Sequence, residues 1–160
     1  MSMEQIIATA HALDGALVFT PEPGSDFPEV TWGDMFFYYA PDGRVPRNVQ
    51  PYATIISGKH PDDATGLDAP GRRRVSIRAG RETFVRLTGE EPRALTRPRD
   101  HAAVDQVMPH PEYGALGWVS VVDPGERTTD VVVQLLRAAH EAARARFVRR
   151  QDSGRPPENS

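Results

Sequence analysis

An apolar stripe with helical spacing lies at each end of this chain, and short strand-like segments lie between the two. The first stripe runs through residues 2–13 and stops at Asp14-Gly15. The second belongs to a longer C-terminal helix, whose buried side is expected to hold Val132, Leu135, Leu136, Ala139, Ala143 and Phe147. Because each helix has to bury its stripe against another layer, this arrangement predicts an α+β fold.

Five segments between the two helices have the pattern of β-strands. They are residues 16–20, 35–39, 52–57, 74–79 and 117–122. The fourth alternates polar Arg74, Ser76 and Arg78 with apolar residues, which predicts a half-buried antiparallel strand. Residues 80–88 and 100–107 are expected to form two short helices. Since the connections are short, we expect an antiparallel meander sheet with the N- and C-terminal helices packed on one face.

Length and composition favour one globular domain. The chain has 160 residues, about the size of one ordinary domain, and 39% of them are apolar. We expect a single domain over residues 1–150 and a disordered tail over 151–160, where the residues are almost all polar, Pro or Gly. No apolar run approaches the ~18 residues of a membrane span. With no cysteine and no secretory pattern, we expect a soluble, cytoplasmic protein without membrane contact.

Charge is distributed unevenly along the chain. Residues 1–43 hold seven acidic residues and no Lys or Arg, so the rest of the chain carries a net charge of +4. Arginine is concentrated in residues 72–86 and 137–150. Guanidinium groups bind phosphate and carboxylate through paired hydrogen bonds. However, the pI of about 5.9 is below the value of about 9 that is typical of dedicated nucleic-acid domains. A solvated arginine surface, a small anionic ligand, and pairing of the acidic and basic parts within one chain or a homodimer all remain open.

Three motifs that occur in order support a resemblance. They are Trp-Gly-Asp with the aromatic strand over residues 32–39, Arg-Glu-Thr-Phe over 81–84, and residues 108–121, which contain Met-Pro-His-Pro and Gly-Trp-Val-Ser-Val. On these motifs the chain resembles a bacterial family of unknown function of about this length, over residues 2–150. More distantly it is similar to the MmcQ/YjbR proteins, which implies a compact, frataxin-like sandwich and a role in binding DNA. The loop over residues 58–71 departs from that distant pattern. No catalytic residue is established in either family, so none is carried over.

One cluster has the residue types of a metal site. His101 and Asp105 are four residues apart, so on a helix they share a face. His110 lies in the proline-flanked turn that follows this segment. Two histidines and one carboxylate suit Fe²⁺ or Zn²⁺. The alternative is that His101 lies near a helix start and that the His110 ring bonds a backbone carbonyl. A metal-assisted enzyme is therefore an alternative, and we expect no metal and no cofactor.

Aromatic and arginine residues supply the candidates for a binding site. Two prolines stiffen the loop that presents His110 and Tyr113, and such loops often carry binding residues. Aromatic side chains from the strands either line a pocket or pack in the core. Arginines on residues 74–79 form an anion-binding surface if that face of the sheet is open. The candidate ligand-binding residues are Trp32, Tyr38, Arg78, His110, Tyr113 and Trp118.

Sequence motifs of common enzymes are missing. The chain contains no Gly-x-Ser-x-Gly, no phosphate-binding loop and no Gly-x-Gly-x-x-Gly. We therefore expect a non-catalytic domain that binds a ligand or a protein partner. DNA binding in the manner of the MmcQ/YjbR proteins and a metal-assisted enzyme using His101, Asp105 and His110 are the alternatives.

Overall fold

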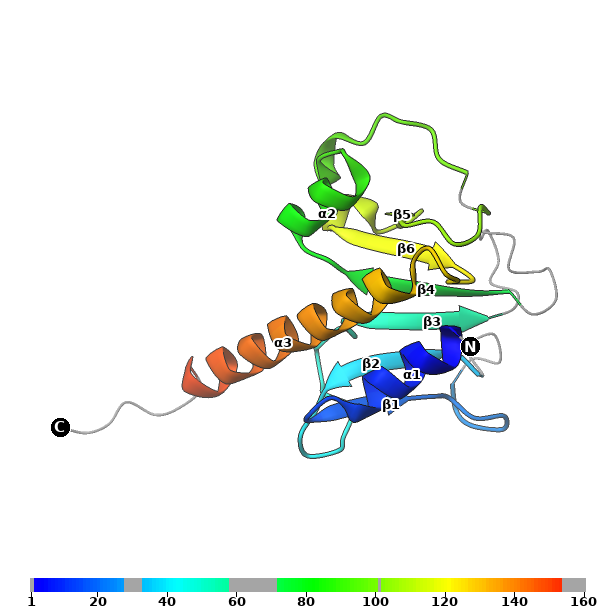
Figure 1. Cartoon of the computed structure of the whole chain (residues 1–160). Coiled ribbons are helices and arrows are strands. Elements are labelled where there is room, and N and C mark those ends of the chain that lie inside the picture. The colour runs from blue at the N-terminus through cyan, green and yellow to red at the C-terminus, as the bar shows by residue number, and fades with distance from the viewer. Residues whose placement is uncertain (1, 28–32, 58–71, 101, 154–160) are drawn as a thin grey trace.

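A computed structural model describes residues 2–27, 33–57, 72–100 and 102–153. Within these residues, six antiparallel strands form one sheet in the order β1-β2-β3-β4-β6-β5 (Figure 1). The strands are β1 (Ala16–Phe19), β2 (Met35–Tyr39), β3 (Ala53–Ser57), β4 (Arg73–Arg78), β5 (Met108–Pro109) and β6 (Trp118–Val122). The α-helices are α1 (Ser2–Ala12), α2 (Arg81–Thr88) and α3 (Thr129–Ser153), and two short 3₁₀ helices are η2 (Pro92–Ala94) and η3 (Gly114–Leu116). The predicted α+β class and the antiparallel meander are confirmed.

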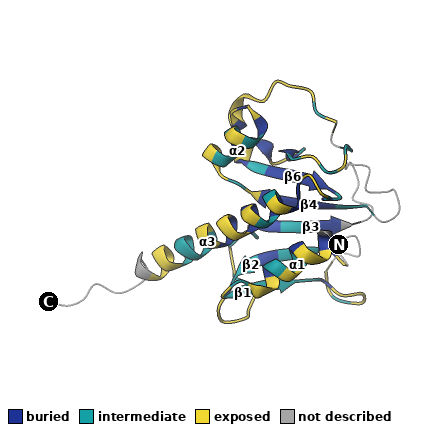
Figure 2. Cartoon of the chain, in the orientation of Figure 1, coloured by how far each residue is buried: buried dark blue, intermediate teal, exposed yellow. Residues whose placement is uncertain are grey.

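Both terminal helices cover the same face of the sheet, as the sequence predicts. α1 packs on β1, α3 crosses β2 and β4, and the two helices contact each other (Figure 1). Their inner sides and the middle of the sheet are buried, whereas their outer sides are exposed (Figure 2). The largest fully buried side chains of this core are Phe37, Phe84, Ile6, Ile55, Ile77, Leu136, Val75, Val119, Val121 and Val132. Burying each such side chain contributes about 1.5–3 kcal/mol, so the helices hold the sheet mainly through this layer.

The opposite face of β4 is not open to solvent. Arg74 is 6% exposed and Ser76 is 1% exposed, and Ser120 of the neighbouring β6 is 2% exposed. The prediction of a half-buried strand is therefore wrong, because both faces of β4 are covered. Arg78, at the end of the strand, is the exposed member of the alternating polar set. Of the predicted anion-binding face, only this end remains accessible.

The helix expected over residues 100–107 is not formed by the described residues of that segment. Val104 instead makes a parallel bridge with Val122 of β6, and Asp105 has a φ of 55°. The Asp105 amide donates to the carbonyl of Val122 (2.8 Å). Because these groups bond to β6 and not to the residues four positions before them, the helical pattern cannot propagate. The premise that His101 and Asp105 share a helical face is thereby lost.

Other expected segments end at different residues or lie outside the described part of the chain, and three short elements were not expected. α3 continues to Ser153, three residues into the range 151–160 predicted as a tail, and the rest of that range lies outside the described residues. The predicted loop over residues 58–71 also lies outside them. β5, η2 and η3 were not predicted, because segments of two or three residues are too short for a periodic pattern. In the described part of the chain, no helix combines the length and the apolar character that crossing a bilayer requires.

Candidate functional site

The turn between β4 and α2 positions the best-formed candidate site. β4 ends at Arg78, and Gly80 then adopts a φ of 81°, which only glycine reaches at little cost. Gly117, at the start of β6, has a φ of 86°, and its carbonyl accepts from the Ala79 amide (3.0 Å). The turn is therefore held against β6 through backbone contacts, while its other side faces α3.

A cavity of about 180 Å³ lies between this turn and α3. Its lining comprises Arg78, Ala79, Gly80, Thr83, Leu135, Ala138, Ala139, Ala142 and Arg146. The alanines of α3 leave this space open because their side chains end at Cβ. Arg78 and Arg146 supply the charge, and none of the described residues that line the cavity is acidic. We call this cavity the arginine hollow.

Electrostatics sets Arg146 apart from other arginines of the surface. Burial lowers the pKa of Arg146, and the neighbouring Arg78, Arg150 and Arg149 lower it further. Arg81 and Arg144 differ, because each pairs with a glutamate that raises its pKa. No ion pair connects Arg78 or Arg146 to an acidic side chain within residues 2–27, 33–57, 72–100 and 102–153. The arginine hollow therefore has excess positive charge that an anion would offset.

Three of the predicted ligand-binding residues lie together around the start of β6. The ring of His110 is 4.8 Å from that of Tyr113 and 6.4 Å from that of Trp118. Trp118 of β6 is the cross-strand partner of Arg78 of β4. The His110 Nδ1 accepts hydrogen bonds from the amides of Glu112 and Tyr113, both at 3.0 Å. This nitrogen is thus engaged in holding its own loop, while the Tyr113 ring is 47% exposed.

Of the remaining aromatic candidates, the described Tyr38 does not join this cluster. Tyr38 lies on β2 opposite Leu17 of β1, so β3 separates it from Arg78. Its side chain is half-buried, and burial raises the pKa of the Tyr38 hydroxyl. Trp32 lies outside the described residues. The described aromatic candidates therefore do not form one pocket around Tyr38.

The metal set is only partly described. His101 lies outside the described residues. The Asp105 carboxylate accepts from the amides of Gly125 (2.7 Å), Arg127 and Thr128 (both 3.1 Å) and from the Thr128 hydroxyl (2.6 Å). Burial opposes the charge on Asp105, but these donors outweigh it, so the pKa of Asp105 lies below its usual value. Within the described ranges, no group of three or more His, Asp or Glu side chains has the arrangement of a metal site.

Arg146, Gly80 and Thr83 were missed as candidate site residues. Arg146 belongs to the arginine-rich segment over residues 137–150, where composition alone does not distinguish it from its neighbours. One signal was available: Ala138, Ala142 and Arg146 are spaced by four residues, so they form one helical stripe of small side chains that ends in a cation. What the stripe faces could not be read from the sequence.

The chain matches the model of one known protein family. A profile described as "Family of unknown function (DUF6194)" matches residues 1–152. The chain belongs to this family. The resemblance to a family of unknown function is therefore confirmed at that level, whereas the distant similarity to the MmcQ/YjbR proteins stays a prediction. No curated protein and no solved structure matches the chain. Because the family description names no activity, function has to be argued from the geometry.

Proposed function

We propose that this chain is a non-catalytic binding domain that holds a small anion in the arginine hollow. The observation that carries the proposal is that Arg78 and Arg146 line one cavity without an acidic partner among its described lining residues. Arg146 is partly buried and has the like charge of Arg78 beside it, which raises the free energy of the empty site. A bound anion removes that cost and accepts hydrogen bonds from both guanidinium groups.

The size of the hollow limits the ligand. Its volume of about 180 Å³ is below the roughly 300–1,000 Å³ of sites that enclose drug-sized molecules. An inorganic phosphate, a sulfate or a small carboxylate fits such a space, and so does the phosphate end of a larger ligand. Thr83 lines the same cavity and adds a hydroxyl donor. We therefore propose a phosphate-sized anion as the ligand class.

DNA binding, which the resemblance to the MmcQ/YjbR proteins implies, has less support. Several arginines of the basic segment over residues 72–86 are buried or already bonded to other groups of the domain. Arg72 donates to the Ala102 carbonyl, Arg74 is buried, and Arg81 pairs with Glu91. A duplex backbone needs many accessible cations at once, whereas a single phosphate-sized anion needs only the two in the hollow. For location we propose the cytoplasm, because a chain without cysteine cannot form the disulfide bonds that are common in proteins of oxidising compartments.

A thermal-shift titration with inorganic phosphate tests the proposal. Phosphate is added at constant ionic strength, with chloride as the balancing anion. Binding to the folded state alone raises the Tm in proportion to the logarithm of the phosphate concentration above Kd. Arg78→Gln and Arg146→Gln are expected to remove at least most of this increase. Arg137→Gln is the matched control, because Arg137 is exposed on α3 and does not line the hollow.

Three results contradict the proposal. One is a wild-type Tm that is the same in phosphate as in chloride. Another is an increase in Tm on adding phosphate that is unchanged in both Arg78→Gln and Arg146→Gln. The third is an Arg137→Gln variant that loses as much of the phosphate-induced increase in Tm as Arg146→Gln does. Such a result indicates only a general attraction between phosphate and the positive charge of the protein. If the chain binds duplex DNA with micromolar affinity, and if that affinity falls steeply as the salt concentration rises, the nucleic-acid alternative is favoured instead.

A further inference from the structure

β1 is the outer strand at one end of the sheet, and part of its backbone has no partner there among the described residues. The Ala40 amide donates to the Gly15 carbonyl (2.8 Å), and the register pairs Leu17 with Tyr38 and Phe19 with Phe36. In an antiparallel ladder, alternate residues bond to the neighbouring strand. Val18 therefore directs its N–H and C=O away from β2. No other described residue bonds to these two groups.

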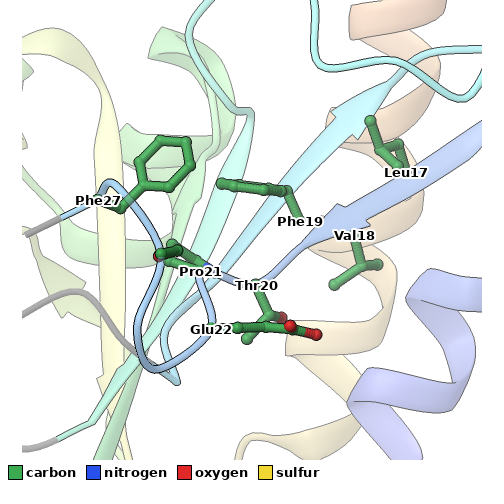
Figure 3. A pocket seen from close by; sticks show the side chains of 8 residues that line it. Leu17, Val18, Phe19, Thr20, Pro21, Glu22 and Phe27 are labelled. Carbon is green, nitrogen blue, oxygen red and sulfur yellow. The ribbon is translucent and has the colours of Figure 1, made fainter. Parts of the chain in front are cut away.

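A second cavity lies along the same strand. It measures about 500 Å³, and its lining includes Leu17, Val18, Phe19, Glu22 and Phe27 (Figure 3). The ring of Phe27 is 49% exposed and lies 5.0 Å from the ring of Phe19, edge to face. Apolar side chains thus border the strand whose Val18 backbone faces outward. This combination is what an added strand requires: backbone groups for hydrogen bonds and pockets for alternate side chains.

The chain segment that forms this edge is acidic. Residues 12–27, which include β1, contain three acidic residues and no Lys or Arg. Glu22 lines the cavity, and Asp14 and Asp26 are exposed on either side of it in the chain. The adjacent β2 carries no charged residue. An incoming strand with positive charge is therefore attracted here, whereas an acidic one is repelled.

We propose that the β1 edge is a docking site for a basic, extended segment of a partner protein, which adds to the sheet as a strand beside β1. Its backbone pairs with the outward groups of Val18, one set of side chains enters the cavity beside Phe19 and Phe27, and its cations lie near Glu22. The site is separate from the arginine hollow, since β2 and β3 lie between β1 and β4.

A second copy of this chain fits the edge less well. Pairing β1 with β1 around a two-fold axis brings the acidic residues of both copies together. Such like-charge contacts oppose association. A basic partner segment avoids this repulsion, so we take it as the occupant and make self-association an outcome of the test.

Fluorescence anisotropy with designed peptides tests this proposal on the full chain. The probe is an acetylated, labelled hexapeptide in which lysine and valine alternate. One control peptide replaces lysine with glutamate, and another carries N-methyl groups on alternate residues, which remove strand hydrogen bonds and keep the charge. Val18→Pro removes the outward N–H of β1 without removing a bond to β2, and proline is tolerated on edge strands. Glu22→Gln removes the acid from the cavity.

Saturable binding of the basic peptide is expected, with at least a tenfold loss in Val18→Pro and a smaller loss in Glu22→Gln. The acidic and N-methylated peptides are expected to bind at least tenfold more weakly than the basic one. The N-methylated peptide keeps the proposal falsifiable if Val18→Pro fails to fold, which circular dichroism reports. Absence of binding, or equal binding of the basic and N-methylated peptides, overturns the proposal. Sedimentation velocity that finds a dimer, dissociated by Val18→Pro, overturns it in favour of a second copy.

Discussion

His140 of α3 hydrogen-bonds Tyr52, which immediately precedes β3, across the core. The Nδ1 atom of His140 lies 3.1 Å from the Tyr52 hydroxyl, and its Nε2 lies 2.6 Å from the carbonyl of Asp14. A carbonyl only accepts, so Nε2 carries the proton and Nδ1 accepts from the hydroxyl. The ring thus connects α3 to the turn before β1 and to the start of β3. Burial also raises the pKa of Tyr52 above its usual value, which keeps this hydroxyl a donor.

Replacing this histidine is expected to destabilise the domain. His140→Leu leaves the Tyr52 hydroxyl and the Asp14 carbonyl without their partner in the interior, at a cost of about 2–4 kcal/mol. His11→Leu is the matched control, because His11 is exposed on α1, and its effect is expected to stay within about 0.5 kcal/mol. Urea unfolding followed by circular dichroism measures both. Equal stabilities of the two variants would contradict the connecting role of His140.

Asp105 is expected to stabilise the start of α3 from a distance. Its carboxylate accepts from the amides of Gly125, Arg127 and Thr128, so Asp105→Asn should cost about 1 kcal/mol, as loss of a helix cap does. Asp105→Ala should cost more. Asparagine tolerates the φ of 55° at this position better than alanine does. Chemical unfolding of both variants checks the order, and an alanine variant as stable as the asparagine variant would argue against it.

Glu90 is expected to make stability depend on acid pH. Hydrogen bonds from the Thr96 amide, the Arg99 guanidinium and the Arg97 amide lower the pKa of Glu90 to about 2, and nearby positive charge adds to this. The folded chain therefore binds this proton less readily than the unfolded chain does. The stabilisation is complete above the usual carboxyl range near pH 4.5 and is lost as the pH falls towards 2.

The measurement compares wild type with Glu90→Gln in urea at several pH values. The variant should be less stable at pH 6, and the difference should narrow below about pH 4.5 and be small near pH 2. Glu91→Gln is the control, since Glu91 is exposed and pairs with the exposed Arg81. A difference that does not change between pH 6 and pH 2 would show that the charge of Glu90 is not the cause.

Gly15 is expected to tolerate substitution poorly, for two separable reasons. Gly15 and Gly24 have φ values of 72° and 84°, where an alanine is strained by about 1–2 kcal/mol. At Gly15 a Cβ would also lie 2.6 Å from the Tyr39 ring, whereas at Gly24 it would meet nothing within 4 Å. Gly15→Ala should therefore be less stable than Gly24→Ala by about 1–3 kcal/mol, the usual cost of overpacking. Thermal unfolding of the two variants measures this difference, and similar Tm values would mean that Tyr39 moves aside freely.

Local patterns alone determined most of the elements. Apolar spacing predicted α1 and α3, and glycine and proline turns bounded the strands, because both signals depend on neighbours within a few residues. The prediction that the two helices share one face followed from the short connections. Where a helix was expected over residues 100–107, the pattern failed. Asp105 bonds to the amides of Gly125–Thr128, some 20 residues away, and no local signal reports such a partner.

Residue types at the candidate site were readable from the sequence, but their distances were not. Arg78 and the His110, Tyr113 and Trp118 group were proposed from their chemistry alone. Only the tertiary structure brings Arg146 to Arg78, because that pairing depends on how α3 crosses the sheet. It likewise covers Arg74 and leaves the Val18 backbone facing outward. A sequence specifies which groups a chain carries and its local conformation, whereas solvent access and contact between distant groups arise when the layers pack.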